Sequence, residues 1–191
     1  MAIFKRYYSR QGLWSLFLTT ALPLHLWTLF LGLRDFDWVT ARTNSWDAVG
    51  VVSYGLLFAL FESVMIFFAV ALVGLFVSAK WEEKRRIALL SLLVIIWSIW
   101  SMFNQAYFLN EWGTPDWLTN LVIATGRPLV ALYALAFGLS LVTVSLPVFM
   151  TLRSEKFLNG IQEGIERLSL LMLLYLVFDA AAIVNIIIRN I

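Results

Sequence analysis

Three ionisable side chains stand inside long apolar stretches of this sequence: His25, Glu62 and Asp179. Each lies near the middle of its stretch, so the sequence predicts all three at one depth. A charged group at the centre of a bilayer costs about 2.5–3.5 kcal/mol on insertion scales, and such residues usually face the interior of a helix bundle. The set therefore predicts a mid-membrane polar site that could hold a proton or a cation. The alternative is interhelical hydrogen bonding, which is favoured because no second motif specifies a reaction.

A second group of polar residues is expected nearer the outer ends of the apolar stretches. Asn104 and Gln105 lie in the outer half of the third stretch, Asn185 lies in the outer half of the fifth, and Arg127 precedes the fourth. Together Asn104, Gln105 and Arg127 could line an outer pocket for an anion or a polar headgroup. Interhelical hydrogen bonds with an interfacial arginine are the simpler interpretation.

The residue inventory excludes several kinds of chemistry. The chain has no cysteine and one histidine, which rules out disulfides, a thiol nucleophile and a histidine-rich metal site. Ligation of a haem or pigment by His25 alone stays open but is disfavoured. The phosphate-binding, nucleophile-elbow and zinc-protease motifs are missing too. We therefore expect no catalytic residues, no metal and no resident cofactor, with an intramembrane lipid-modifying enzyme as the least favoured alternative.

The composition identifies the solvent of this chain as lipid. Of 191 residues, 61% are hydrophobic and 14% are charged, against about 45–50% and 25% in soluble domains. We predict an all-α integral membrane protein with one domain, residues 1–191. Its bundle of five transmembrane helices is expected near residues 13–33, 50–78, 87–109, 128–151 and 168–188. Lipid is then the first partner, and the pI of about 9.0 gives no reason to expect a nucleic acid.

The distribution of basic residues predicts the orientation. With the N-terminus inside, ten of the 14 Lys and Arg residues fall in inner segments and four in outer ones. We therefore expect a cytoplasmic N-terminus and an external C-terminus, in the cytoplasmic (plasma) membrane. The inner residues are Lys5, Arg6, Arg10, Lys80, Lys84, Arg85, Arg86, Arg153, Lys156 and Arg167, and the outer ones are Arg34, Arg42, Arg127 and Arg189.

Three further segments are predicted between the spans. Residues 115–124 should form an interfacial outer helix, with Thr114 as its N-cap, Pro115 in its first turn, and a break before Pro128. Residues 154–167 alternate apolar and charged positions at helical spacing, which predicts an amphipathic helix on the inner leaflet. Residues 34–47 mix acids, arginines and aromatics, and are expected to form an outer loop that covers the bundle or binds an external partner.

The aromatic outer segments, the amphipathic inner helix and the missing reaction motifs together favour a non-catalytic role. We expect a subunit, scaffold or assembly partner of a larger membrane complex, or a homo-oligomer. The alternative is a compact transporter or channel for protons or a small solute, using His25, Glu62 and Asp179. Small residues in the fourth and fifth spans predict that these two spans pack together.

Overall fold

The computed structural model describes residues 7–77 and 80–191, and in these residues it is helical with no strand. Five of the helices are long and apolar enough to cross a membrane, which confirms the membrane class. The orientation residues Lys5 and Arg6, and residue 78 of the second expected span, lie outside the described residues. The elements are α2 (Arg10–Arg42), α3 (Ser45–Val73), the 3-10 turn η1 (Gly74–Phe76), α4 (Glu83–Leu109), α5 (Asp116–Ala124), α6 (Pro128–Arg153) and α7 (Glu155–Asn190).

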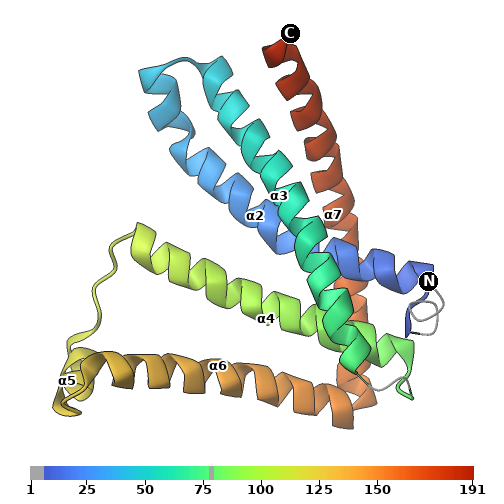
Figure 1. The fold of residues 1–191 in the computed structure, drawn as a ribbon, viewed down its shortest axis with the longest axis vertical. Coiled ribbons are helices and arrows are strands. Elements are labelled where there is room, and N and C mark those ends of the chain that lie inside the picture. Colours follow the sequence, from blue (N-terminus) through green and yellow to red (C-terminus); the bar gives the residue numbers. More distant parts are fainter. Residues whose placement is uncertain (1–6, 78–79) are drawn as a thin grey trace.

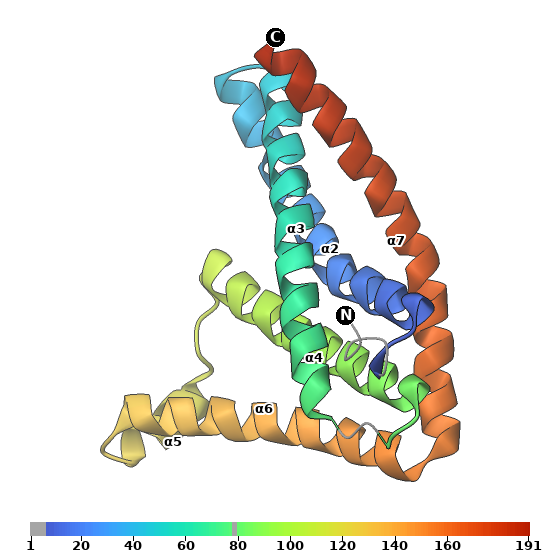
Figure 2. The same cartoon turned by 45° about the vertical axis from the view of Figure 1, so that its right-hand side comes forward.

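The long helices form two groups that share one end of the molecule. The later part of α2, helix α3 and the later part of α7 lie together at the end of the molecule where the C-terminus is found, whereas α4 and α6 extend away from them (Figures 1 and 2). We call the shared end the convergent end, defined by residues 7–12, 74–77, 80–86 and 151–158. Trp100 of α4 donates a 3.0 Å hydrogen bond to Thr143 of α6, which links the two members of the second group. The two groups therefore spread apart with distance from the convergent end, while the helices of the first group stay in contact.

Helix α2 packs against three of the other long helices, α3, α4 and α7. Its interior contains Pro23, which lacks an N–H donor and bends helices. The first part of α2 crosses the bundle and the later part turns to run beside α3 (Figure 1). Neighbours on several sides cover the segment before the turn, which holds the buried residues Leu16, Leu18, Thr19, Thr20, Ala21, Leu22, Pro23 and His25. The hydroxyls there bond to their own helix, as Thr20 does to the Leu16 carbonyl at 2.8 Å.

The prediction of an outer loop over residues 34–47 is wrong. Helix α2 continues to Arg42 and α3 begins at Ser45, so only residues 43–44 connect them. The Asn44 side chain accepts a 2.9 Å hydrogen bond from the Asp47 amide and caps α3. The Arg42 guanidinium lies 3.7 Å from the Trp38 ring centre, one helical turn away. The charged and aromatic residues of this segment lie on the end of α2 and the start of α3, which form a helical hairpin. The segment does not form a lid.

The predicted inner amphipathic helix is not a separate element. It forms the first part of α7, a single helix of 36 residues that starts after the N-cap Ser154. Its apolar face packs inside the protein, because Leu158 and Ile165 are only 2% and 5% exposed. Protein therefore covers part of the face that was expected to contact the inner leaflet, and the expectation of a separate helix is wrong. Periodicity detects an apolar face but does not say whether lipid or protein covers it.

The short helix predicted over residues 115–124 is present as α5, but its predicted N-cap differs. Pro115 occupies the N-cap position of α5, and the Thr114 hydroxyl pairs instead with the Tyr107 hydroxyl at 2.9 Å. The chain breaks between α5 and α6 where predicted. Gly126 has φ of +69°, a left-handed conformation that favours glycine, and Pro128 opens α6.

The predicted packing of the fourth span against the fifth is also wrong. Helix α7 packs along α3 and α2, and α6 meets α7 mainly near the convergent end (Figure 2). Thr151, at that end, is the one buried residue of the 26 in α6. A Cβ added at Gly138, in the predicted small-residue face of α6, would have nothing within 4 Å. Small residues permit close contact between helices but do not select the partner.

Candidate mid-membrane polar sites

The structure brings together two of the three predicted mid-membrane residues. His25 of α2 and Asp179 of α7 meet inside the three-helix group, with the His25 Nε2 atom 3.1 Å from Asp179 Oδ1 and 3.0 Å from Oδ2. The side chains are 0% and 4% exposed. The opposite ring nitrogen, Nδ1, lies 2.8 Å from the Ala21 carbonyl oxygen. Both buried polar groups thus have hydrogen-bond partners within the protein, as burial requires.

This geometry fixes how many protons the pair holds. A carbonyl oxygen can only accept a hydrogen bond, so His25 Nδ1 carries a hydrogen and donates it to Ala21. The contact between Nε2 and the carboxylate then needs one more proton, held by either the imidazole or the carboxyl. In both cases the pair is neutral overall. The two residues therefore link α2 to α7 without leaving a net charge in the membrane.

Glu62, the third predicted residue, lies apart from this pair. It belongs to α3, and it lines an open cavity of about 510 Å³ between α2, α3 and α4. Glu62 is exposed, whereas Asp179 is buried. The structure thus divides the predicted set into a closed pair and an open carboxyl.

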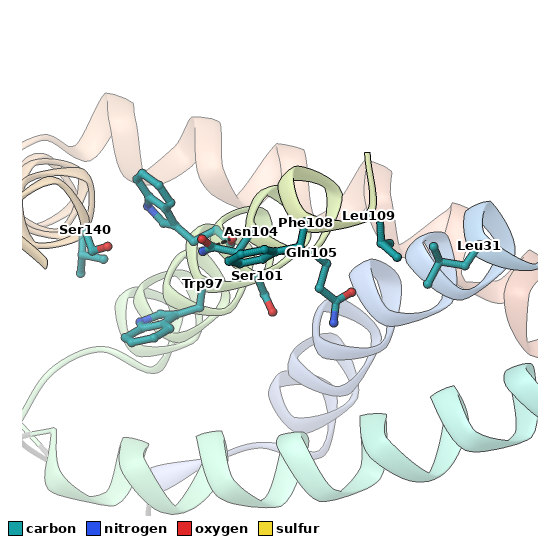
Figure 3. Close-up of a pocket in the computed structure, with 10 residues that line it drawn as sticks. Leu31, Trp97, Ser101, Asn104, Gln105, Phe108, Leu109 and Ser140 are labelled. Atoms are coloured by element: carbon teal, nitrogen blue, oxygen red, sulfur yellow. Dashed lines mark hydrogen bonds between the residues drawn. The ribbon is translucent and has the colours of Figure 1, made fainter. Parts of the chain in front are cut away.

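Two of the three residues predicted for an outer pocket, Asn104 and Gln105, line one cavity in the structure. This cavity of about 790 Å³ lies between α4, α6 and α2, where Gln105 points toward α2 and Ser140 lies on α6 (Figure 3). The Asn104 amide donates to the Trp100 carbonyl of its own helix at 2.8 Å, and the Gln105 oxygen accepts a hydrogen bond from Trp27. Arg127 is not part of this wall. It is exposed at the N-cap of α6, beyond the break that follows α5.

Asn185, expected in the same outer region, serves to join helices. Its side-chain amide donates a 2.8 Å hydrogen bond to Ser53 of α3. Closer to the C-terminus, Arg189 forms an ion pair of 2.7 Å with Asp47 and donates to the Trp46 carbonyl. With His25 and Asp179, these contacts place polar links from α7 to its neighbours at successive depths.

Sequence reasoning missed the roles of two residues at the convergent end. Arg86 was counted as an orientation charge, yet it is 1% exposed and donates to the carbonyls of Tyr7 and Trp81. Tyr8 is 4% exposed and donates a 2.9 Å hydrogen bond to the Ala71 carbonyl. Burial raises the pKa of Tyr8 above its ordinary value, and the nearby Arg86 charge partly opposes that rise. A basic residue beside a span carries no sequence signal that separates burial from exposure.

The arrangement offers little to a metal or haem. No cluster of three or more His, Asp or Glu side chains suited to a metal occurs in residues 7–77 and 80–191. Both ring nitrogens of His25 already have protein partners, so ligation of a haem iron would require breaking one of these contacts. His25 therefore has no unpaired ring nitrogen that could serve as an axial ligand to haem iron.

Five long apolar helices, with a closed polar pair where α2 and α7 cross, define a multi-span α-helical membrane protein. No protein-family model, no curated protein and no solved structure matches this chain.

Proposed function

We propose that this protein is a non-catalytic subunit or assembly partner in a larger membrane complex, formed with other membrane chains or with further copies of itself. The observation that carries the proposal is the position of α6. This helix is long enough to span a membrane, but only Thr151 is buried along its 26 residues. A partner helix that packed on α6 would supply the neighbours that this chain does not.

The packing of the other helices supports the same function. Helices α2, α3 and α7 have mutual polar links, whereas α4 and α6 lean away and expose large side chains such as Phe137 (66%) and Tyr133 (73%). Without a hydrophobic effect between helices in lipid, association depends on van der Waals packing and polar contacts. A splayed pair of helices gains more from a protein neighbour than from mobile lipid chains. The proposal includes the cytoplasmic membrane as the location and an N-terminus on the inside.

Site-specific photo-crosslinking in native membranes tests this proposal. A photoreactive phenylalanine analogue at Phe137 of α6 should give a defined protein adduct. The matched control is the same analogue at Phe58 of α3, which is 67% exposed and belongs to the packed group. Phe58 should give mainly lipid adducts. Lipid adducts alone at both positions, together with a monodisperse monomer after mild detergent extraction, would refute the assembly role.

Transport of a proton or small solute is the second candidate, favoured by the cavity that Glu62 lines. Since His25 and Asp179 pair with each other, this function would depend on Glu62 rather than on all three residues. Flux into liposomes should then be lower for Glu62→Gln than for the unaltered chain. Equal flux from both would remove Glu62 from any transport step.

A further inference from the structure

The Glu62 cavity combines a carboxyl group with aromatic and apolar walls. Glu62 stands midway along α3, and Ile66, Val70 and Val73 line the same cavity at helical spacing. Glu62 therefore lies on the face of α3 that borders the cavity. No hydrogen bond or ion pair joins Glu62 to another residue in the part of the chain that the structure describes.

The opposite walls provide no positive charge. Helix α2 contributes Trp27 and Thr28, and α4 contributes Trp97, Ser98 and Gln105. Trp97 is 68% exposed, and Trp27 is held in place by its hydrogen bond to Gln105. Tryptophan faces attract cations through the ring quadrupole, most strongly where water is excluded. A carboxyl group and two indoles around one volume are the groups that recognise a positively charged organic ligand.

The size and the donor set narrow the class of cation. The volume of about 510 Å³ falls within the roughly 300–1,000 Å³ typical of small-molecule sites. An inorganic ion would need several oxygen ligands in fixed geometry, and Glu62 is the one acidic residue in the lining. Apolar side chains make up most of the wall and suit a ligand whose charge is spread over hydrophobic groups.

We propose that the cavity between α2, α3 and α4 binds an amphiphilic organic cation, with Glu62 as its counter-ion and Trp27 and Trp97 as aromatic walls. This site is independent of the proposed assembly function, because all its walls come from one chain. A proton on Glu62 is the competing way to neutralise the carboxyl.

Binding of two hydrophobic ions of the same shape and opposite charge tests the proposal. The purified full chain in detergent micelles is dialysed to equilibrium against radiolabelled tetraphenylphosphonium or tetraphenylborate, with empty micelles as the blank. The chain should bind tetraphenylphosphonium saturably with one site per protein. Tetraphenylborate should show no saturable binding beyond the blank.

Variants assign the binding to Glu62. Glu62→Gln should weaken tetraphenylphosphonium binding by about tenfold or more, since it keeps the shape and removes the charge. Glu62→Asp should lose less, and Trp97→Leu should weaken binding by roughly threefold to tenfold through loss of the aromatic wall. The control Glu82→Gln removes a carboxyl outside the cavity and should bind within about twofold of the unaltered chain. Circular dichroism and thermal unfolding check that every variant is folded.

Two results would overturn the proposal. One is affinity for tetraphenylphosphonium that is the same in Glu62→Gln and in the unaltered chain. The other is the lack of saturable tetraphenylphosphonium binding in the unaltered, folded chain. Neither result bears on the crosslinking at Phe137, so this proposal and the assembly role can fail separately.

Discussion

His25 Nε2 lies 3.0 Å from Asp179 Oδ2 although the residues are 154 positions apart, and this contact joins the first and last spans of the chain. Its other ring nitrogen donates to Ala21, so one proton must lie between the imidazole and the carboxyl. The pair therefore acts as a neutral, geometrically specific link between α2 and α7, and it can be tested by changing the partners separately and together.

We expect Asp179→Asn to change the free energy of unfolding by less than about 1 kcal/mol, because an asparagine amide can donate to the free Nε2 atom. Asp179→Leu leaves Nε2 buried without a partner and should cost about 1–3 kcal/mol. The double variant His25→Leu/Asp179→Leu should recover part of that loss, since both polar groups are removed. Denaturant unfolding in mixed micelles measures all three. Equal losses for the Asn and Leu variants would contradict the shared proton.

Arg86 should contribute more to stability than its neighbour Arg85. Arg86 is buried and donates to two backbone carbonyls, so Arg86→Ala should cost about 1.5–3 kcal/mol. Arg85 pairs with Glu155, which is 71% exposed, so the control Arg85→Ala should cost less than about 1 kcal/mol. Unfolding measurements, with proteolysis near Tyr8 as a local readout, would separate them. A larger effect at Arg85 would show that the convergent end is held by the surface pair instead.

Alkaline pH should destabilise the convergent end through Tyr8. Because burial raises the pKa of Tyr8 above the unfolded value, folding favours the neutral phenol. The stabilising contribution is therefore complete below the unfolded pKa of about 10 and is lost as pH rises through the higher folded pKa. Tyr8→Phe should lower stability at neutral pH, through loss of the hydrogen bond to Ala71, and flatten the alkaline decline. Unfolding as a function of pH, followed with phenolate absorbance, checks this. An unchanged alkaline decline in Tyr8→Phe would assign it to other groups.

The proposed orientation predicts opposite labelling of two introduced cysteines. The chain has no cysteine of its own, so single substitutions report directly. Gly113 and Gly160 suit the purpose, since an added Cβ at either meets nothing within 4 Å. With a cytoplasmic N-terminus, Gly113→Cys should react with a membrane-impermeant maleimide in intact cells, and Gly160→Cys should react only after permeabilisation. The reverse pattern would show that the topology is inverted.

Much of the secondary structure follows from the sequence, and its errors have a common cause. The predicted span 13–33 extends to Arg10–Arg42, and the predicted span 168–188 extends to Glu155–Asn190. Charges mark where a helix leaves the hydrocarbon, but backbone hydrogen bonding continues into the interface and beyond. Helix ends were therefore less predictable than the spans themselves.

The same distinction between sequence and tertiary structure applies to the candidate site residues. The sequence by itself determined that His25, Glu62 and Asp179 lie within long apolar helices, because composition and the length of the apolar stretches identify such helices. Only the tertiary structure decided that His25 meets Asp179, that Glu62 faces a separate cavity, and that Arg127 stands apart from Asn104 and Gln105. Depth depends on position along one helix. Contact between two residues depends on how their two helices rotate, bend and cross. Here the turn of α2 at Pro23 and the divergence of α4 and α6 from the other helices decide which residues meet.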